Sequence, residues 1–125
     1  MTAANPAILV VEDELLLRLT AVEIVKDAGF EALSAATADE ALAILEARAD
    51  VRLVFTDIQM PGSMDGLGLA HAVRDRWPPV ELIVTSGRAH IPAKDLPDGG
   101  RFFAKPYDVE ALSQAFQEMA GADRH

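Results

Sequence analysis

The sequence has 125 residues, of which 50% are hydrophobic and 25% charged, with a net charge of −9 and no cysteine. This length predicts one domain over residues 1–125, with a core over about residues 6–120. The lack of cysteine excludes disulfides and thiolate nucleophiles, and the lack of clustered Lys and Arg argues against direct nucleic-acid binding. Because no apolar stretch approaches the roughly 20 residues of a membrane span and the N-terminus lacks a secretory signal, we expect no membrane contact and a cytoplasmic location.

The first predicted strand, residues 7–11, is a continuous apolar run that ends on the acids Glu12 and Asp13. Such a run is typical of a strand buried on both faces, in a parallel sheet covered by helices. A helix is predicted to follow over about residues 14–28. It ends at Gly29, because glycine readily adopts the left-handed backbone of a helix C-terminus.

The alternation of strand and helix then continues. Residues 30–35 predict a short strand, and the sequence from Thr37 to Glu40 has the spacing of a capping box that begins a second helix. The central strand, residues 53–57, is apolar until it stops on Asp57. On this stretch alone, capping of the following turn is an alternative role for that carboxylate.

The second half of the chain repeats the pattern. A third helix is predicted over about residues 67–77, and a strand over residues 80–84 that finishes on Thr85. Pro92 and Pro97 confine any helix between residues 88 and 99 to one or two turns. A last strand, residues 101–104, finishes on Lys105, and a helix from Asp108 to about Ala120 closes the chain.

Five strands that alternate with helices predict an α/β fold: a doubly wound, five-stranded parallel sheet with helices on both faces and a short or irregular fourth helix. Each strand that ends on a polar residue delivers it to the same edge, because the ends of central parallel strands converge there. The residues concerned are Glu12, Asp13, Asp57, Thr85 and Lys105. We therefore predict one shared site rather than five separate turn caps.

Three carboxylates within a few ångströms repel one another by roughly 1 to 4 kcal/mol per pair. A hard divalent cation removes this repulsion, and Mg²⁺ is the ion that suits an all-oxygen site. Asp57 could then act as an oxygen nucleophile toward phosphorus and form an acyl phosphate, with Thr85 and Lys105 holding the phosphoryl oxygens. No metal-ligand spacing relates His71, His90 and His125, which are expected on the surface.

From end to end, the chain resembles a response-regulator receiver domain of two-component signalling. The resemblance rests on four motifs in order: Val-Val-Glu12-Asp13-Glu, Phe-Thr-Asp57-Ile-Gln-Met-Pro-Gly, Val-Thr85-Ser-Gly and Phe-Phe-Ala-Lys105-Pro106. It implies that Asp57 accepts a phosphoryl group from a sensor histidine kinase or a histidine phosphotransfer protein. Such a domain is no enzyme in its own right, although it assists its own phosphorylation and dephosphorylation.

The resemblance also implies the ligands and the switch of the site. The Mg²⁺ ligands would be Glu12, Asp13, Asp57 and the carbonyl of Gln59. The peptide bond between Lys105 and Pro106 would be cis. Phe102 matches the aromatic residue whose rotamer follows the movement of Thr85 toward the phosphate, with ordinary core packing as the alternative.

Two departures from the family pattern affect these expectations. The loop after the acceptor, residues 60–66, is longer than usual. The segment between Thr85 and Lys105 is short and holds Pro92, Pro97, Gly99 and Gly100 where receivers usually have a regular helix. Because that helix commonly belongs to the output face, its loss argues against dimerisation through the fourth helix, fifth strand and fifth helix.

The predicted first helix carries two apolar stripes. The first consists of Leu17, Ala21, Ile24 and Ala28, and the second of Leu15, Leu19 and Val22. The first stripe is expected to face the sheet. We hypothesise that the second binds the helical bundle of a phosphodonor or a second copy of the domain, unless neighbouring loops cover it. Residues 121–125 are too few for an effector domain, so a natural C-terminus there predicts output by binding or phosphate relay.

Three other functions stay open. A haloacid-dehalogenase-type phosphatase shares the strand-end aspartate and Mg²⁺, but it requires a second acid where Gln59 stands. A flavodoxin-like cofactor site is disfavoured by the acids after the first strand, which would repel a phosphate. A phosphorylation-independent scaffold of the same fold would not need to keep such mutually repelling side chains.

Overall fold

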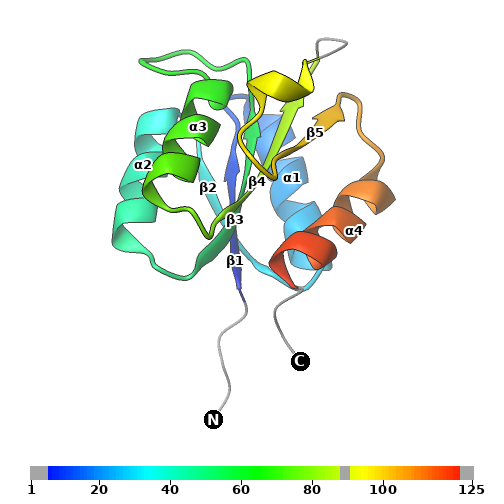
Figure 1. Ribbon diagram of the computed structural model, residues 1–125. Coiled ribbons are helices and arrows are strands. Elements are labelled where there is room, and N and C mark those ends of the chain that lie inside the picture. The colour runs from blue at the N-terminus through cyan, green and yellow to red at the C-terminus, as the bar shows by residue number, and fades with distance from the viewer. Residues whose placement is uncertain (1–5, 88–90, 122–125) are drawn as a thin grey trace.

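The computed structural model describes residues 6–87 and 91–121. Five parallel strands form one sheet in the order β2-β1-β3-β4-β5 (Figure 1). The strands are β1 (Ala7–Val11), β2 (Glu31–Ala35), β3 (Val51–Asp57), β4 (Glu81–Ser86) and β5 (Arg101–Ala104). The strand order reverses beside β1, so the carboxyl ends of β1 and β3 lie at the switch point where doubly wound sheets bind ligands.

Helices cover both faces of the sheet, which confirms the predicted doubly wound fold. The helices are α1 (Leu15–Asp27), α2 (Ala38–Ala47), α3 (Gly66–Arg76) and α4 (Val109–Ala120). Figure 1 shows α1 and α4 on one side of the sheet and α2 and α3 on the other. Among the described residues, no helix is both long and apolar enough to cross a membrane.

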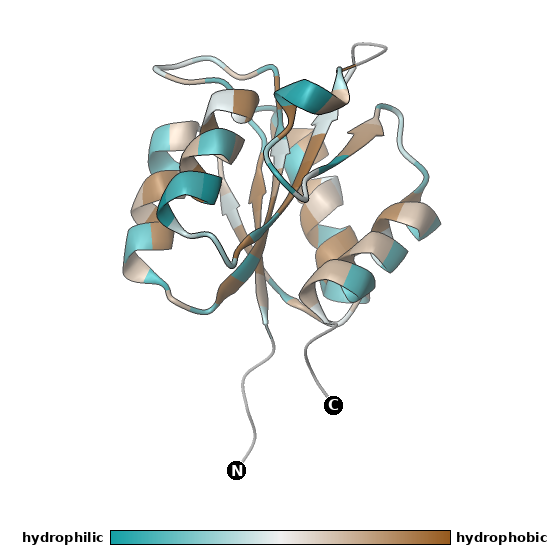
Figure 2. Cartoon of the chain, viewed as in Figure 1, coloured by the Kyte–Doolittle hydropathy of each residue, from teal (hydrophilic) through white to brown (hydrophobic). Residues whose placement is uncertain are grey.

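The core has two layers, one on each face of the sheet. Leu9 of β1 and Val54 of β3 pack beneath α2 and α3, whereas Ile8 and Phe55 pack beneath α1 and α4. Successive residues of a strand point to opposite faces, so a strand buried on both faces must be apolar at every position. Figure 2 shows hydrophobic residues along the strands and both hydrophobic and hydrophilic residues along the helices.

No regular helix connects β4 to β5 within the described residues. A single 3₁₀ turn, η1 (Ala93–Asp95), follows Pro92, and Ile91 and Leu96 pack against the core beneath α2 and α3. The ring nitrogen Nε2 of His71 on α3 lies 2.7 Å from the Asp95 carbonyl oxygen and donates to it. The predicted short or irregular fourth helix is confirmed, while His90 and His125 lie outside the described residues.

The two apolar stripes of α1 are only partly as expected. Leu17 was expected to face the sheet, but its side chain is 40% exposed. It lies in the first turn of α1, close to the edge at which the strands end, so this prediction is wrong. Leu15 and Leu19 are exposed as expected, and Leu16 is exposed beside them. Val22 is half-buried and packs against the core beneath α1 and α4.

Candidate functional site

The register of the sheet brings the polar strand ends to one edge. Val11 of β1 pairs with Thr56 of β3, so Glu12 follows β1 at the level of Asp57. Asp57 in turn pairs with Thr85 of β4. Because the strands are parallel, the side chains that follow or end them meet on the same edge of the sheet.

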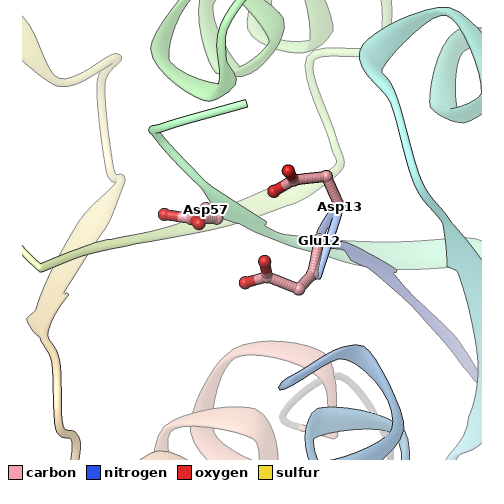
Figure 3. A group of neighbouring side chains, drawn as sticks. All are labelled: Glu12, Asp13 and Asp57. Atoms are coloured by element: carbon pink, nitrogen blue, oxygen red, sulfur yellow. The ribbon is translucent and has the colours of Figure 1, made fainter. Parts of the chain in front are cut away.

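Three carboxylates gather at this edge (Figure 3). Glu12, Asp13 and Asp57 each offer one oxygen, and these oxygens all lie within 4.8 Å of one another. Glu12 and Asp57 are only 6% and 5% exposed, while Asp13 is exposed. Burial removes much of the water that would otherwise screen their repulsion, so the group needs positive charge nearby.

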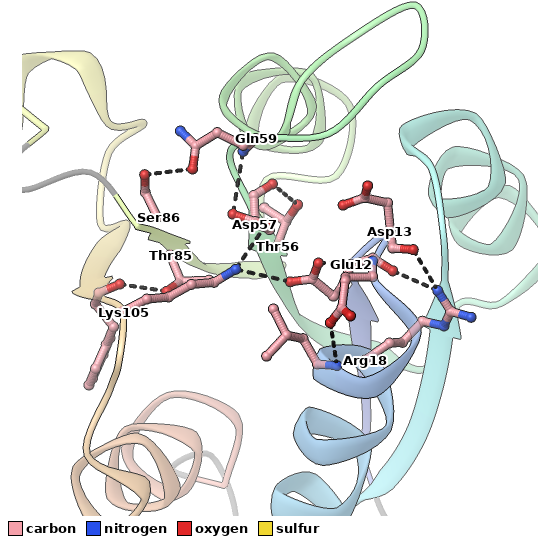
Figure 4. Close-up of polar contacts among 12 residues, drawn as sticks. Glu12, Asp13, Arg18, Thr56, Asp57, Gln59, Thr85, Ser86 and Lys105 are labelled. Carbon is pink, nitrogen blue, oxygen red and sulfur yellow. Dashed lines mark hydrogen bonds and ion pairs between the residues drawn. The ribbon is translucent and has the colours of Figure 1, made fainter.

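Lys105 supplies one positive charge. Its Nζ donates to Asp57 Oδ2 at 3.0 Å and to Glu12 Oε1 at 3.3 Å, so it bridges the two buried acids (Figure 4). Burial alone would lower the pKa of Lys105, but the hydrogen bond and charge of Asp57, together with Glu12, outweigh burial and raise it. Lysine is therefore charged at neutral pH and fixes the position of the Asp57 carboxylate.

Glu12 has a pKa above its ordinary value in this cluster. Burial raises its pKa and the charge of Asp57 raises it further, whereas the Glu14 backbone N–H and Lys105 act in the opposite direction. That N–H donates to Glu12 Oε2 at 3.1 Å. The ionised form of Glu12 is thus less favourable in the folded protein than in water, which leaves a place for additional positive charge.

Thr85 is buried beside Asp57, but its hydroxyl is engaged elsewhere. Its Oγ1 donates to the Phe103 carbonyl oxygen of β5 at 2.6 Å. Phe102, the neighbouring residue of β5, is half-buried and packs against the core beneath α2 and α3. The hydroxyl therefore connects the centre of the sheet to the strand that carries this aromatic ring.

Gln59 lies two residues beyond Asp57 at the beginning of the loop. Its backbone N–H donates to Asp57 Oδ1 at 3.3 Å, and its side-chain Oε1 accepts from Ser86 Oγ at 2.8 Å. The side chain is thus held by β4, and the backbone is next to the acids. The peptide bond between Lys105 and Pro106 is cis, as the sequence resemblance implied.

The sequence alone did not single out two further residues of the site. Gly66 begins α3, and a Cβ there would lie 1.8 Å from the Asp57 carbonyl oxygen, so only glycine allows α3 to approach the strand end. Arg18 of α1 donates from Nη1 to the Glu12 carbonyl oxygen at 2.8 Å. The Asp65-Gly66 pair at the end of a loop is a sequence signal for a turn, so Gly66 could have been recognised from the sequence. The contact of Arg18 depends on its side-chain rotamer, which the sequence does not report.

The donor chemistry of this edge fits Mg²⁺. All candidate ligands are oxygens: the three clustered carboxylates, and the backbone carbonyl of Gln59, which follows Asp57 by two residues in the sequence. Hard cations such as Mg²⁺ take carboxylates, carbonyls and water, whereas softer metals favour nitrogen and sulfur. The excess of negative over positive side chains at the site points in the same direction.

Comparison with known proteins gives relatives over most of the chain. The C4-dicarboxylate transport transcriptional regulatory protein DctD of Rhizobium meliloti is 35% identical over 116 residues, which are 90% of this chain and 25% of that protein. The sensor kinase CckA of Brucella abortus is 32% identical over 121 residues, which are 94% of this chain and 13% of that protein. The chain therefore spans a quarter or less of the length of these two relatives.

Solved structures agree with the fold. A response regulator receiver protein from Sinorhizobium medicae has a TM-score of 0.87 at 26% identity, covering 96% of this chain and 98% of that one. The receiver domain of the hybrid histidine kinase CckA has a TM-score of 0.77 at 30% identity, covering 91% and 98%. Residues 8–117 match the family profile of the response regulator receiver domain. The chain thus belongs to the receiver domains of response regulators, the phosphoacceptor domains of two-component systems.

Proposed function

We propose that Asp57 is the phosphoacceptor of this receiver and that Glu12, Asp13, Asp57 and the Gln59 carbonyl hold Mg²⁺. The observation that carries the proposal is the position of Asp57: it is buried at a strand end, hydrogen-bonded to Lys105 and within 4.8 Å of two more acids. When bound, Mg²⁺ would supply positive charge to the carboxylates and to the incoming phosphoryl oxygens.

In the proposed reaction, a carboxylate oxygen of Asp57 forms a bond to phosphorus while the bond from phosphorus to the donor's imidazole nitrogen breaks. The nitrogen keeps the electron pair of that bond. Lys105 Nζ, 3.0 Å from Asp57 Oδ2, is placed to neutralise the phosphoryl oxygens. Phosphoryl transfer requires mainly positioning and charge neutralisation, and both are available from these residues.

We further propose that Thr85 and Phe102 form the switch. To reach a phosphoryl group on Asp57, the Thr85 hydroxyl must leave the Phe103 carbonyl, which it contacts at 2.6 Å. Loss of that bond changes the contact between β4 and β5, next to Phe102. The half-buried ring can respond because it is not enclosed on all sides.

The phosphodonor is proposed to be a sensor histidine kinase or a histidine phosphotransfer protein. The exposed apolar surface of α1, formed by Leu15, Leu16 and Leu19, is its proposed binding surface, and half-buried Val22 borders it. These leucines are 56%, 69% and 51% exposed. Because α1 begins two residues after Asp13, a helical bundle seated on this surface lies beside the edge that holds Asp57. A cytoplasmic location is proposed with this partner.

The binding surface is tested by Leu15→Glu/Leu19→Glu. The expected result is a large loss of phosphotransfer from a phosphorylated donor protein, with phosphorylation by acetyl phosphate unchanged because that small donor needs no docking surface. Ala43→Glu/Ala47→Glu on the exposed side of α2 is the matched control. Unchanged phosphotransfer in the α1 variant would contradict the surface, and a change confined to self-association would assign it to a second copy of the chain.

Incubation with acetyl phosphate, with and without Mg²⁺, tests the acceptor. We expect a gain of one phosphoryl group per chain that depends on Mg²⁺ and is absent in Asp57→Asn. Sustained turnover of a phosphate ester would instead indicate a hydrolase of haloacid-dehalogenase type. Such a hydrolase lacks support here because Gln59 occupies the place of its general acid and is hydrogen-bonded to Ser86. No phosphorylation under any condition would favour a scaffold.

A further inference from the structure

Arg18 contacts the backbone of both acids that follow β1. Its Nη1 donates to the Glu12 carbonyl oxygen at 2.8 Å and lies 3.5 Å from the Asp13 carbonyl oxygen (Figure 4). The residue lies in the first turn of α1, where its backbone N–H bonds to the Glu14 carbonyl oxygen. Side chains of a helix lean toward its N-terminus, so an arginine at this position reaches back over the preceding turn.

The turn from β1 to α1 carries two of the three clustered carboxylates. The Glu14 N–H holds the side chain of Glu12, and the Glu14 side chain caps α1 by accepting from the Leu17 N–H at 3.0 Å. These bonds fix one acid and the start of the helix. Arg18 adds the bond to the carbonyls themselves, which sets the peptide planes from which the side chains of Glu12 and Asp13 project.

The guanidinium of Arg18 is used for these carbonyls rather than for an ion pair. Within residues 6–87 and 91–121, no carboxylate oxygen lies close enough to Arg18 to form a salt bridge. The side chain is nevertheless half-buried. A long cationic side chain that is ordered on main-chain oxygens next to an acidic cluster has a geometric role, since a purely electrostatic one would be served by contact with a carboxylate.

We propose that Arg18 is a positioning residue for the Mg²⁺ site. By holding the Glu12 and Asp13 carbonyls, it directs both carboxylates toward Asp57 before the cation arrives. The inference rests on the proposed Mg²⁺ site and adds to it a residue that contacts neither the cation nor the phosphoryl group. Groups that orient metal ligands commonly change metal affinity by about 10- to 100-fold when they are removed.

An electrostatic role and a positioning role of Arg18 predict opposite changes in Mg²⁺ affinity when the side chain is removed. If Arg18 acted only through its charge, its removal would strengthen Mg²⁺ binding, because one repelling cation would be lost. If it positions the ligands, its removal weakens binding. Arg18→Lys separates the two further, because an ammonium keeps the charge but does not offer the planar fork of donors of a guanidinium.

The experiment is calorimetric titration of the whole chain with Mg²⁺ in the absence of a phosphodonor. We expect Arg18→Gln to bind Mg²⁺ at least about 10-fold more weakly than the unmodified protein, and Arg18→Lys to show an intermediate loss. The matched control is Lys26→Gln, which removes one exposed positive charge from the far end of the same helix. The Lys26→Gln variant should bind Mg²⁺ with the same affinity as the unmodified protein.

Equal or tighter binding by Arg18→Gln would overturn the inference, and if that variant does not fold, Arg18→Lys is judged by the same criterion. Absence of Mg²⁺ binding by the unmodified protein would instead contradict the proposed metal site itself.

A second readout is the Mg²⁺ dependence of phosphorylation by acetyl phosphate. Arg18→Gln should raise the half-saturating Mg²⁺ concentration and reach the same extent at saturation. A lower extent with unchanged half-saturation would contradict a positioning role.

Discussion

At the scale of single residues, the site is defined by an imbalance of charge. Lys105 bonds to two of the three clustered acids, at 3.0 Å and 3.3 Å, and so offsets only part of their repulsion. Glu12 shows the consequence, because burial and the charge of Asp57 raise its pKa. The proposed Mg²⁺ site therefore holds unfavourable negative charge that a bound cation would offset.

Glu12→Gln should therefore stabilise the fold in buffer that contains a chelator. We expect the free energy of unfolding at pH 7 to rise by roughly 1 kcal/mol, the lower end of the range for a like-charge contact at about 4 Å, because the variant also loses the ion pair with Lys105. The pKa of Glu12 is raised from 4.5, so the folded state disfavours the ionised form above that value. Below pH 4.5 the carboxyl is protonated in both states, so the gain should disappear as the pH falls toward that value.

Urea unfolding of both proteins at pH 7 and at low pH measures this difference. Asp98→Ser, which removes an exposed carboxylate in the loop before β5, controls for the change in net charge. A Glu12→Gln protein that is less stable than the unmodified protein at pH 7 would contradict the assignment of unfavourable charge to Glu12.

At the scale of elements, the packing of α3 against the end of β3 depends on the lack of a Cβ atom at Gly66. The backbone N–H of Gly66 donates to the Ile58 carbonyl oxygen at 2.9 Å. Any Cβ on Gly66 would lie 1.8 Å from the Asp57 carbonyl oxygen and 2.6 Å from its carbon. α3 can therefore contact the end of β3 at this point only through glycine.

Gly66→Ala is expected to cost about 3 kcal/mol or more, because α3 must move away from β3. Gly68→Ala, two residues along the same helix, is the matched control. Its Cβ would meet the flexible side chain of Met64 at 3.0 Å and Asp65 Oδ1 at an ordinary contact distance of 3.5 Å. The stability of this variant should therefore stay within about 1 kcal/mol of that of the unmodified protein. Thermal unfolding of both variants measures the difference. Equal stabilities would contradict the close approach of α3.

The segment between β4 and β5 is the element that departs most from the expected family pattern. Ile91 and Leu96 still bury apolar surface beneath α2 and α3, and His71 holds the Asp95 carbonyl. With only a single 3₁₀ turn, the segment thus still covers the core on the side of the sheet that carries α2 and α3. A surface built from a regular fourth helix is not available in the described residues for association of two chains.

At the scale of the whole molecule, the fold and the acidic edge could be predicted because they depend on apolar runs and their ends. The runs of β1, β3, β4 and β5 each stop at a polar residue, and parallel topology brings these residues together regardless of detailed packing. Leu17 was misassigned because helical periodicity does not state where the sheet beneath a helix ends. The contacts of Arg18 and of the Thr85 hydroxyl depend on rotamers that tertiary packing selects, so no sequence pattern reports them.

Binding of a cation to the folded chain should stabilise the whole molecule. At a Mg²⁺ concentration 100 times the dissociation constant, the free energy of unfolding is expected to rise by about 2.7 kcal/mol. Asp13→Asn should abolish most of this gain, and its exposed side chain makes a folding defect a poor explanation for the loss. Denaturant unfolding with and without Mg²⁺ provides the measurement. An equal gain in the variant would place the cation elsewhere.

Chemical trapping of the phosphorylated residue tests directly whether Asp57 is the acceptor. The protein is phosphorylated with acetyl phosphate and Mg²⁺, reduced with borohydride, and mapped by peptide mass spectrometry. Reduction converts an aspartyl phosphate to homoserine, so we expect homoserine at position 57 and unmodified residues at Glu12 and Asp13. Homoserine at another position, or a phosphorylated chain that gives none, would contradict Asp57 as the acceptor.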